Sequence, residues 1–167
     1  MRQFKVLILA CFAALSSVAG VSTVAAQVVQ GEEHCVVNIK TTDTLNLRSA
    51  GKASAKVVTT LPYARCGVVV TGACQGSWCP VDAGHHAGWV NSRFISMVSP
   101  ARYCVAGVAK NDVLNLRAFP AGTSRILATL KPNQCEISFL PYATGAWQKV
   151  RVEGYEGWVN KQFVSGQ

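Results

Sequence analysis

Short apolar runs, separated by Gly, Pro and small polar residues, follow one another along most of this chain. Leu45-Asn46-Leu47-Arg48 alternates apolar and polar side chains, which is the pattern of a half-buried strand. Other short runs rich in β-branched and aromatic residues predict strands at 35–39, 57–61, 67–71, 78–81 and 88–90. Turns are expected at Pro62 and at 75–77, and one short helical turn at 91–94. The pattern predicts an all-β fold.

The same pattern occurs twice, because residues 35–98 align with residues 104–167 at an offset of 69 without a gap. Nineteen of the 64 aligned positions are identical, and they fall in blocks. Leu45-Asn46-Leu47-Arg48 recurs at 114–117, and Gly88-Trp89-Val90-Asn91 recurs at 157–160. Such blocks indicate an internal duplication. We therefore expect two small β-barrels in tandem, each of about 64 residues, joined by a linker at 99–103.

The first 26 residues follow a different pattern. Arg2 and Lys5 precede an apolar run at 6–15, and small residues lead up to Ala26. This order is typical of a secretory signal peptide, so we expect residues 1–26 to be cleaved and residues 27–34 to form an N-terminal lead.

Two alternatives to cleavage fit less well. The apolar run is short for a retained membrane anchor. A lipoprotein would need its cysteine after the apolar run, whereas Cys11 lies inside it. The mature protein is expected to be periplasmic or secreted, with no stable membrane span.

Export also changes the net charge of the protein and the partners that this charge indicates. The full chain carries a formal charge of +8, which falls to +6 once Arg2 and Lys5 are removed. The remaining Lys and Arg residues are spread over both units without a basic cluster. A basic exported protein suits an anionic envelope, and both the spread and the export argue against nucleic acid as a partner.

Six of the seven cysteines lie beyond residue 26, and an even number in an exported chain indicates disulfides. Six cysteines permit many pairings, but the repeat favours one set, in which Cys35–Cys66 recurs as Cys104–Cys135. Cys74 and Cys79 flank the turn at 75–77 and are expected to pair with each other. Each long bridge encloses about 30 residues, which stabilises a small barrel by roughly 3–4 kcal/mol.

A zinc site built from Cys74, Cys79, His85 and His86 is the competing interpretation. Adjacent residues of an extended segment point to opposite faces, so His85 and His86 would not converge on one ion. The second unit lacks all four side chains. No metal site and no cofactor are expected.

Catalytic constellations are also lacking. The histidines beyond residue 26 are His34, His85 and His86, and none recurs in the second unit. Asp43 and Asp112 recur, and an Asp at the start of a strand commonly serves turn hydrogen bonds. We expect a protein that is not an enzyme, with peptidoglycan hydrolysis as the enzymatic alternative.

Taken together, the blocks resemble the bacterial Src-homology-3-like (SH3-like) domain. The resemblance rests on Leu-Asn-Leu-Arg, a small polar loop, a strand ending in Leu, Gly-x-Trp-x-x-Val and Gly-Trp-Val-Asn-x-x-Phe. It covers residues 35–98 and 104–167. The chain departs from the family where Arg-Ser-Gly-Pro is common, since it has Arg48-Ser49-Ala50-Gly51 and Arg117-Ala118-Phe119-Pro120.

The resemblance implies a partly open barrel of five or six strands, found in exported and cell-envelope proteins. There the domain often serves as a targeting module, or as a peptide- or peptidoglycan-binding module, attached to cell-wall hydrolases. By analogy with the eukaryotic relatives, an aromatic ligand floor would comprise Trp78 with Phe94 in the first unit and Trp147 with Phe163 in the second. Large aromatic faces suit sugar rings or proline-rich peptides.

Several of these residues have an equally physical structural interpretation. Trp78 and Trp147 could instead pack on the barrel, and Trp89 and Trp158 are expected to do so. Arg48 and Arg117 could form salt bridges, extend along the apolar surface or contact a ligand.

The functional hypothesis is an exported non-catalytic binding or adaptor module, expected to be a monomer. Its partner would be a cell-wall glycan or peptide such as peptidoglycan, or an envelope protein. The alternative is a small inhibitor or structural partner of an envelope enzyme.

Overall fold

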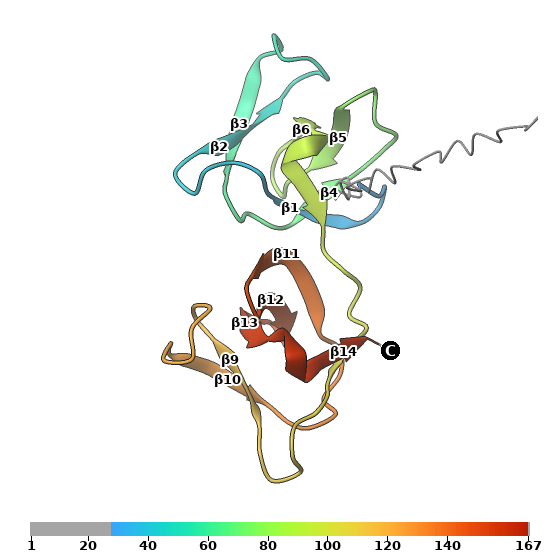
Figure 1. Ribbon diagram of the computed structural model, residues 1–167. Helices are drawn as coiled ribbons and strands as arrows, with labels where there is room; N and C mark the ends of the chain where they lie inside the picture. The colour runs from blue at the N-terminus through green and yellow to red at the C-terminus, as the bar shows by residue number, and fades with distance from the viewer. Residues whose placement is uncertain (1–27, 167) are drawn as a thin grey trace, which may run out of the picture.

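The structure, a computed structural model, describes residues 28–166. The predicted signal peptide at 1–26 lies outside the described residues. The described residues form an all-β protein that contains two short 3-10 helices and no α-helix (Figure 1). A search of the same residues for a helix long and apolar enough to cross a membrane finds none.

The first half of the described chain carries seven strands and one 3-10 helix. In chain order these elements are β1 (Glu33–Val36), β2 (Thr44–Arg48), β3 (Val57–Pro62), β4 (Val68–Val70), β5 (Trp78–Asp82), β6 (Ala87–Asn91), η1 (Ser92–Phe94) and β7 (Ile95–Met97). The strands form one open sheet in the order β3-β2-β6-β5-β4-β1-β7, and every pair is antiparallel.

The second half carries the same number of strands. With one 3-10 helix, its elements in chain order are β8 (Tyr103–Val105), β9 (Leu114–Arg117), β10 (Ile126–Leu130), β11 (Ser138–Thr144), β12 (Trp147–Val152), β13 (Tyr155–Asn160), η2 (Lys161–Phe163) and β14 (Val164–Gly166). Five strands pair in the order β10-β9-β13-β12-β11, and β14 pairs with β8 in a third sheet. An isolated bridge between Tyr103 and Ile137 is what remains of the β1–β4 pairing of the first half. With that difference, the two halves share one strand order.

Each half has its own apolar core, supplied by alternate residues of its strands. In β2 the side chains of Leu45 and Leu47 are buried, whereas Asn46 and Arg48 are only half-buried. The two valines of the Gly-Trp-Val-Asn blocks, Val90 and Val159, are fully buried. The alternation seen in the sequence therefore marks the inner face correctly.

The first strand of each half differs from the expected range. The strand predicted at 35–39, which the offset of 69 repeats at 104–108, is Glu33–Val36 in the first half and Tyr103–Val105 in the second. Both end early because Asn38 and Gly107 adopt positive φ angles of 58° and 67°, which turn the chain out of the extended conformation. The strands β7 and β14, which pair with β1 and β8, were not predicted.

Three disulfides join Cys35 to Cys66, Cys74 to Cys79 and Cys104 to Cys135. These are the pairs that the repeat favours. Because Cys74 and Cys79 are bonded to each other, neither offers a thiolate for the zinc site considered above. Three disulfides within residues 28–166 suggest an oxidising, exported environment.

A third apolar cluster joins the two halves, which Figure 1 shows stacked one above the other. Leu140 and Tyr142 of β11 are buried against Cys35, Val37 and Val98 of the first half. The Tyr142 hydroxyl donates a hydrogen bond of 2.8 Å to the carbonyl of Val36. Burial of this hydroxyl raises the pKa of Tyr142.

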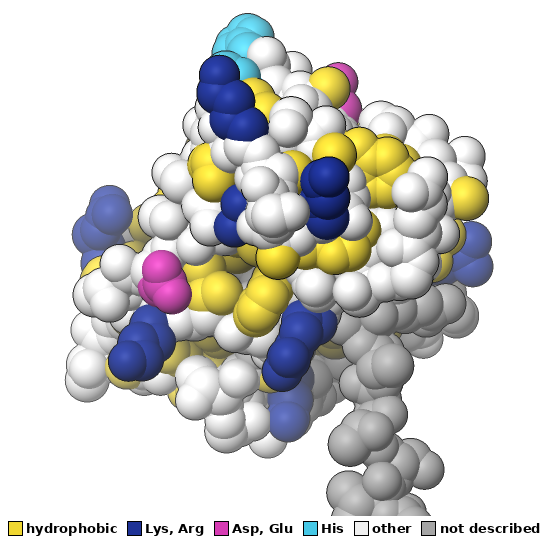
Figure 2. All heavy atoms as spheres, turned by 90° about the horizontal axis from the view of Figure 1, so that it is seen from above, with side chains coloured by type: hydrophobic (Ala, Val, Ile, Leu, Met, Phe, Trp, Pro, Cys, Tyr) yellow, Lys and Arg dark blue, Asp and Glu magenta, His cyan; other side chains and the backbone are white. Residues whose placement is uncertain are grey.

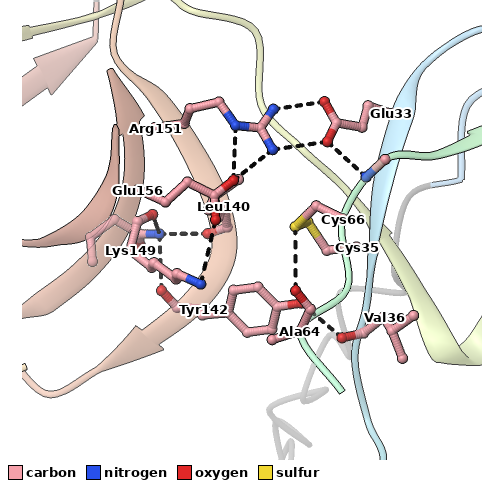
Figure 3. A network of polar contacts seen from close by, with 12 residues as sticks. Glu33, Cys35, Val36, Ala64, Cys66, Leu140, Tyr142, Lys149, Arg151 and Glu156 are labelled. Atoms are coloured by element: carbon pink, nitrogen blue, oxygen red, sulfur yellow. Dashed lines mark hydrogen bonds and ion pairs between the residues drawn. A yellow bond between two sulfur atoms is a disulfide. The ribbon is translucent and has the colours of Figure 1, made fainter. Parts of the chain in front are cut away.

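A bidentate ion pair borders this cluster (Figure 3). The Arg151 guanidinium donates to both carboxylate oxygens of Glu33, at 2.8 and 3.0 Å. It also donates to Glu156, and Glu33 accepts a hydrogen bond from the backbone N–H of Gly67. The hydrogen bonds from Arg151 lower the pKa of the Glu33 carboxyl, and those to Glu33 raise the pKa of Arg151. The halves are thus fixed against each other by a specific joint.

Candidate binding grooves

Two grooves lie at equivalent places in the two halves. Groove 1, of about 370 Å³, is lined by Asn38, Ile39, Lys40, Asp43, Thr44, Leu45, Asn46, Arg48, Trp78, Asn91 and Phe94. Groove 2, of about 490 Å³, is lined by Gly107, Val108, Ala109, Asp112, Val113, Leu114, Asn115, Arg117, Gly122, Trp147, Asn160 and Phe163. At the offset of 69, every residue that lines groove 1 has a counterpart that lines groove 2. The duplication of the sequence has therefore produced a duplicated surface feature.

The structure brings Trp78 and Phe94 into groove 1 and places Trp147 and Phe163 in groove 2. All four side chains are half-buried, so each has packed and accessible surface. Phe94 and Phe163 also pack against the apolar cores of their own halves. Their ligand-binding role remains a prediction, but the placement that it requires is present.

Hydrogen bonds across a tight hairpin orient Trp78. The backbone N–H of Gln75 donates to the Trp78 carbonyl at 2.7 Å, and the Trp78 N–H donates back to the Gln75 carbonyl at 3.1 Å. The Cys74–Cys79 disulfide closes the same hairpin. Across the sheet Trp78 lies opposite Asn91, as Trp147 lies opposite Asn160. Both tryptophans thus stand on hydrogen-bonded strand ends rather than on free loops.

Asn91 and Asn160 begin the short helices that carry the groove phenylalanines. The side-chain oxygen of Asn91 accepts a hydrogen bond from the N–H of Arg93, and that of Asn160 accepts one from the N–H of Gln162, both at 3.2 Å. This is an N-cap, which satisfies an otherwise unpaired backbone donor. The Asn of Gly-Trp-Val-Asn therefore serves to position Phe94 and Phe163.

Asp43 and Asp112 serve turns, as the sequence indicated. Each accepts a hydrogen bond from the next backbone N–H, at 2.7 Å from Thr44 and 2.8 Å from Val113. Sequence reasoning did not assign these residues, or Leu45, Asn46, Asn91 and their counterparts, to the grooves. Their identity in both repeats is the signal that could have found them.

Arg48 and Arg117 support the loops beside the grooves. The Arg48 guanidinium donates to the Ala55 carbonyl at 2.8 Å, and the Arg117 guanidinium donates to the Ser124 carbonyl at 2.7 Å. Each arginine thereby holds the loop that follows its own strand. This loop-anchoring role is not one of those expected from the sequence, which were a salt bridge, packing along the apolar surface and a ligand contact.

Trp89 and Trp158 line neither groove. Trp89 covers the loop at Gly51, where an added Cβ would lie 3.0 Å from the Trp89 ring. Trp158 packs on the apolar cluster between the halves. Both side chains are half-buried, in line with a packing role.

Basic side chains do not gather into a stripe on the face shown in Figure 2. Lys and Arg side chains stand apart there, with hydrophobic side chains exposed between them. Within the grooves, Lys40 and Arg48 oppose Asp43 in groove 1, whereas Arg117 is accompanied by Asp112 in groove 2. The first groove is therefore the more cationic.

The family model for the bacterial SH3 domain matches residues 112–165. This range runs from the loop before β9 into β14, and the match covers one domain in the second half. No curated protein matches the sequence.

Two solved structures of Trichomonas vaginalis proteins are similar to the chain. NlpC2 is 12% identical, with 81% of this chain and 48% of that chain covered and a TM-score of 0.38. NlpC1 is 14% identical, with 86% and 49% covered and the same TM-score. The chain thus spans about half the length of either protein.

Proposed function

We propose that this protein is an exported, non-catalytic adaptor that binds bacterial cell-wall peptidoglycan through two SH3-like units, residues 35–98 and 104–167. The observation that carries the proposal is the duplicated groove, with a Trp and a Phe at the same two positions in each copy. The bacterial SH3 match in the second half and the shared strand order support the same assignment for the first half. The three disulfides are consistent with export.

The groove chemistry supports a glycan-peptide ligand. Trp147 and Phe163 present rigid apolar faces on which a sugar ring can stack. Asn115, Asn160 and Arg117 add polar groups around the same hollow, which suit hydroxyl and amide groups. The scattered basic residues suit a weakly attracted anionic polymer better than a nucleic acid backbone, which requires a continuous basic track.

Retention on purified, insoluble cell wall tests the proposal. The mature protein is expected to sediment with the wall, and a Trp78→Ala/Trp147→Ala variant is expected to lose roughly tenfold in apparent affinity. Tyr155→Ala is the matched control, because Tyr155 is an exposed aromatic residue that lines neither groove.

Circular dichroism must show that each variant is folded. Equal retention of the wild type and the folded double variant would refute binding through the grooves. Absent retention, together with co-purification of one stoichiometric envelope protein, would favour the alternative of an inhibitor or structural partner.

A further inference from the structure

The two grooves share a floor but differ along one rim. Seven lining positions are identical in the two copies: Asp43, Leu45, Asn46, Arg48, Trp78, Asn91 and Phe94 each have the same residue 69 positions later. The other four positions of groove 1, Asn38, Ile39, Lys40 and Thr44, are replaced by Gly107, Val108, Ala109 and Val113. All four positions lie in the loop that leads into β2 or β9 or, for Thr44, at the first residue of β2, so the differences are confined to one wall.

In groove 1 this wall carries polar side chains and is fixed by a hydrogen bond to η1. The Asn38 side chain donates a hydrogen bond of 2.9 Å to the Arg93 carbonyl, which links the loop to η1 beside Phe94. Gly107 takes the place of Asn38 in groove 2, and a Cβ added there would lie 3.9 Å from the Phe163 ring. The missing side chain leaves the wall beside Phe163 open, in keeping with the larger volume of groove 2.

The same wall carries the difference in charge. Lys40 is exposed at the rim of groove 1. Its counterpart in groove 2, Ala109, is uncharged. An acidic group bound on the shared floor would therefore meet one additional cation, Lys40, in the lining of groove 1.

The rim of groove 2 is apolar instead. Val113, in place of Thr44, is 40% exposed. The loop that contributes Gly122 to this groove also carries Phe119, which is 70% exposed and has Ala50 as its counterpart. Val113 therefore makes the rim of groove 2 more apolar than Thr44 makes the rim of groove 1.

We infer that the grooves recognise the same ring-bearing wall polymer but select different parts of it: groove 1 takes a unit that bears a free carboxylate, and groove 2 takes an uncharged unit. Lys40 and Ala109 are the residues that set this difference. The inference rests on the proposed function, because it assumes that both floors bind the wall.

The test uses two soluble muropeptides that differ only in whether the stem-peptide carboxylates are free or amidated. Calorimetry is done with the full mature chain carrying Trp147→Ala, which reports groove 1, and with Trp78→Ala, which reports groove 2. Groove 1 is expected to prefer the free carboxylate by roughly two- to fivefold, as for an exposed ion pair, and to lose this preference at high salt. Groove 2 is expected to bind the amidated fragment at least as well as the free one.

Exchange of the rim residues tests whether the charge of Lys40 causes the preference for a free carboxylate. Lys40→Ala should abolish the preference of groove 1, and Ala109→Lys should create one in groove 2. Lys56→Ala, which removes an exposed charge outside the lining of either groove, should change neither. If the wild type binds neither fragment, the proposed function itself fails. If both fragments bind through the tryptophans and Lys40→Ala leaves the preference unchanged, the rim inference is wrong while the function stands.

Discussion

Gly88 and Gly157 show why the Gly-Trp-Val-Asn block begins with glycine. A Cβ added at Gly88 would lie 2.6 Å from the carbonyl oxygen of Arg48, and one added at Gly157 would lie 2.8 Å from that of Arg117. Neither contact can be relieved by rotating a side chain, because both involve backbone. The glycine thus permits β6 to approach β2, and β13 to approach β9.

Gly157→Ala is expected to lower the free energy of unfolding by about 1–3 kcal/mol, since overpacking at a strand contact forces the backbone to shift. Urea denaturation followed by tryptophan fluorescence measures the loss. Gly122→Ala is the control, because an added Cβ there meets no atom within 4 Å. Equal stability of the two variants would contradict this account of the glycine.

The His34 side chain is fully buried, and its hydrogen bonds are those of an uncharged imidazole ring. One ring nitrogen accepts from the N–H of Val29 at 3.2 Å, and the other donates to the carbonyl of Glu32 at 2.9 Å. Burial lowers the pKa of His34, because the charged ring would be poorly solvated. The residue therefore holds the N-terminal lead to the first half only while it is uncharged.

Acidification is expected to destabilise the protein in two stages. The native pKa values of His34 and Glu33 both lie below the ordinary values of 6.5 and 4.5, so the unfolded chain binds protons more readily. Stability from His34 is therefore full above pH 6.5 and is lost as the pH falls through its native pKa, and that from Glu33 follows below pH 4.5. Urea midpoints across pH 8 to 3 test this, and His34→Gln should flatten the first stage. An unchanged first stage in that variant would assign the loss to other groups.

Among the strands, one hairpin is held in two different ways. In the first half the Cys74–Cys79 disulfide joins the two sides. In the second half the corresponding residues are Ala143 and Gln148, which lie opposite each other, and the Gln148 amide donates to the carbonyls of Leu140 and Tyr142 at 2.7 and 3.1 Å. These hydrogen bonds span the irregularity in β11 that turns Leu140 and Tyr142 toward the first half.

The disulfides are expected to contribute unequally. Chain-entropy arguments give about 2 kcal/mol for the short Cys74–Cys79 loop and about 3–4 kcal/mol for each loop with a sequence separation of 31. Cys35→Ala/Cys66→Ala should therefore lower the melting temperature more than Cys74→Ala/Cys79→Ala, and the burial of Cys35 in the joint increases the difference. Thermal denaturation compares them, and the reverse order would overturn the argument.

The joint between the halves is asymmetric, although the halves are repeats. The first half contributes its β1 end, with Glu33 and Cys35, and the second contributes the outer face of β11 and β12, with Tyr142 and Arg151. In the first half the residues equivalent to Leu140 and Tyr142 are Thr71 and Ala73, which supply no apolar anchor. The joint can therefore form once within the chain and has no equivalent second copy.

Loss of the joint should uncouple the halves. Tyr142→Ala/Arg151→Ala removes the buried ring, its hydrogen bond to Val36 and the ion pair with Glu33, so the joint should weaken by about 2–5 kcal/mol. Calorimetry is expected to show one unfolding transition for the wild type and two for the variant, with faster proteolysis at 99–103. Arg125→Ala, an exposed substitution, should retain the wild-type profile. A single transition in the folded double variant would show that the halves are coupled elsewhere.

Much of the fold could be predicted because it is encoded by neighbours in the chain. Alternation marked the inner face of β2 and β9, the turns separated the strands, and the repeat at 69 favoured the three cysteine pairs over the others. These signals are local or repeated, so one chain suffices to read them. The three-residue strands β7 and β14 were not predicted, because their pairing with β1 and β8 depends on residues about 60 positions away.

The grooves could be predicted only in part from the sequence, and the joint between the halves could not be predicted. The resemblance to the SH3-like domain pointed to Trp78, Phe94, Trp147 and Phe163, but which side chains surround them depends on how a loop before β2 folds back across the strand ends. Glu33 and Arg151 are 118 positions apart and have no common pattern, so their pairing follows only from the packing of one half on the other. Composition and periodicity indicate which residues form strands and which side chains are buried, whereas contacts between distant surfaces depend on complementary packing that exists only in the folded chain.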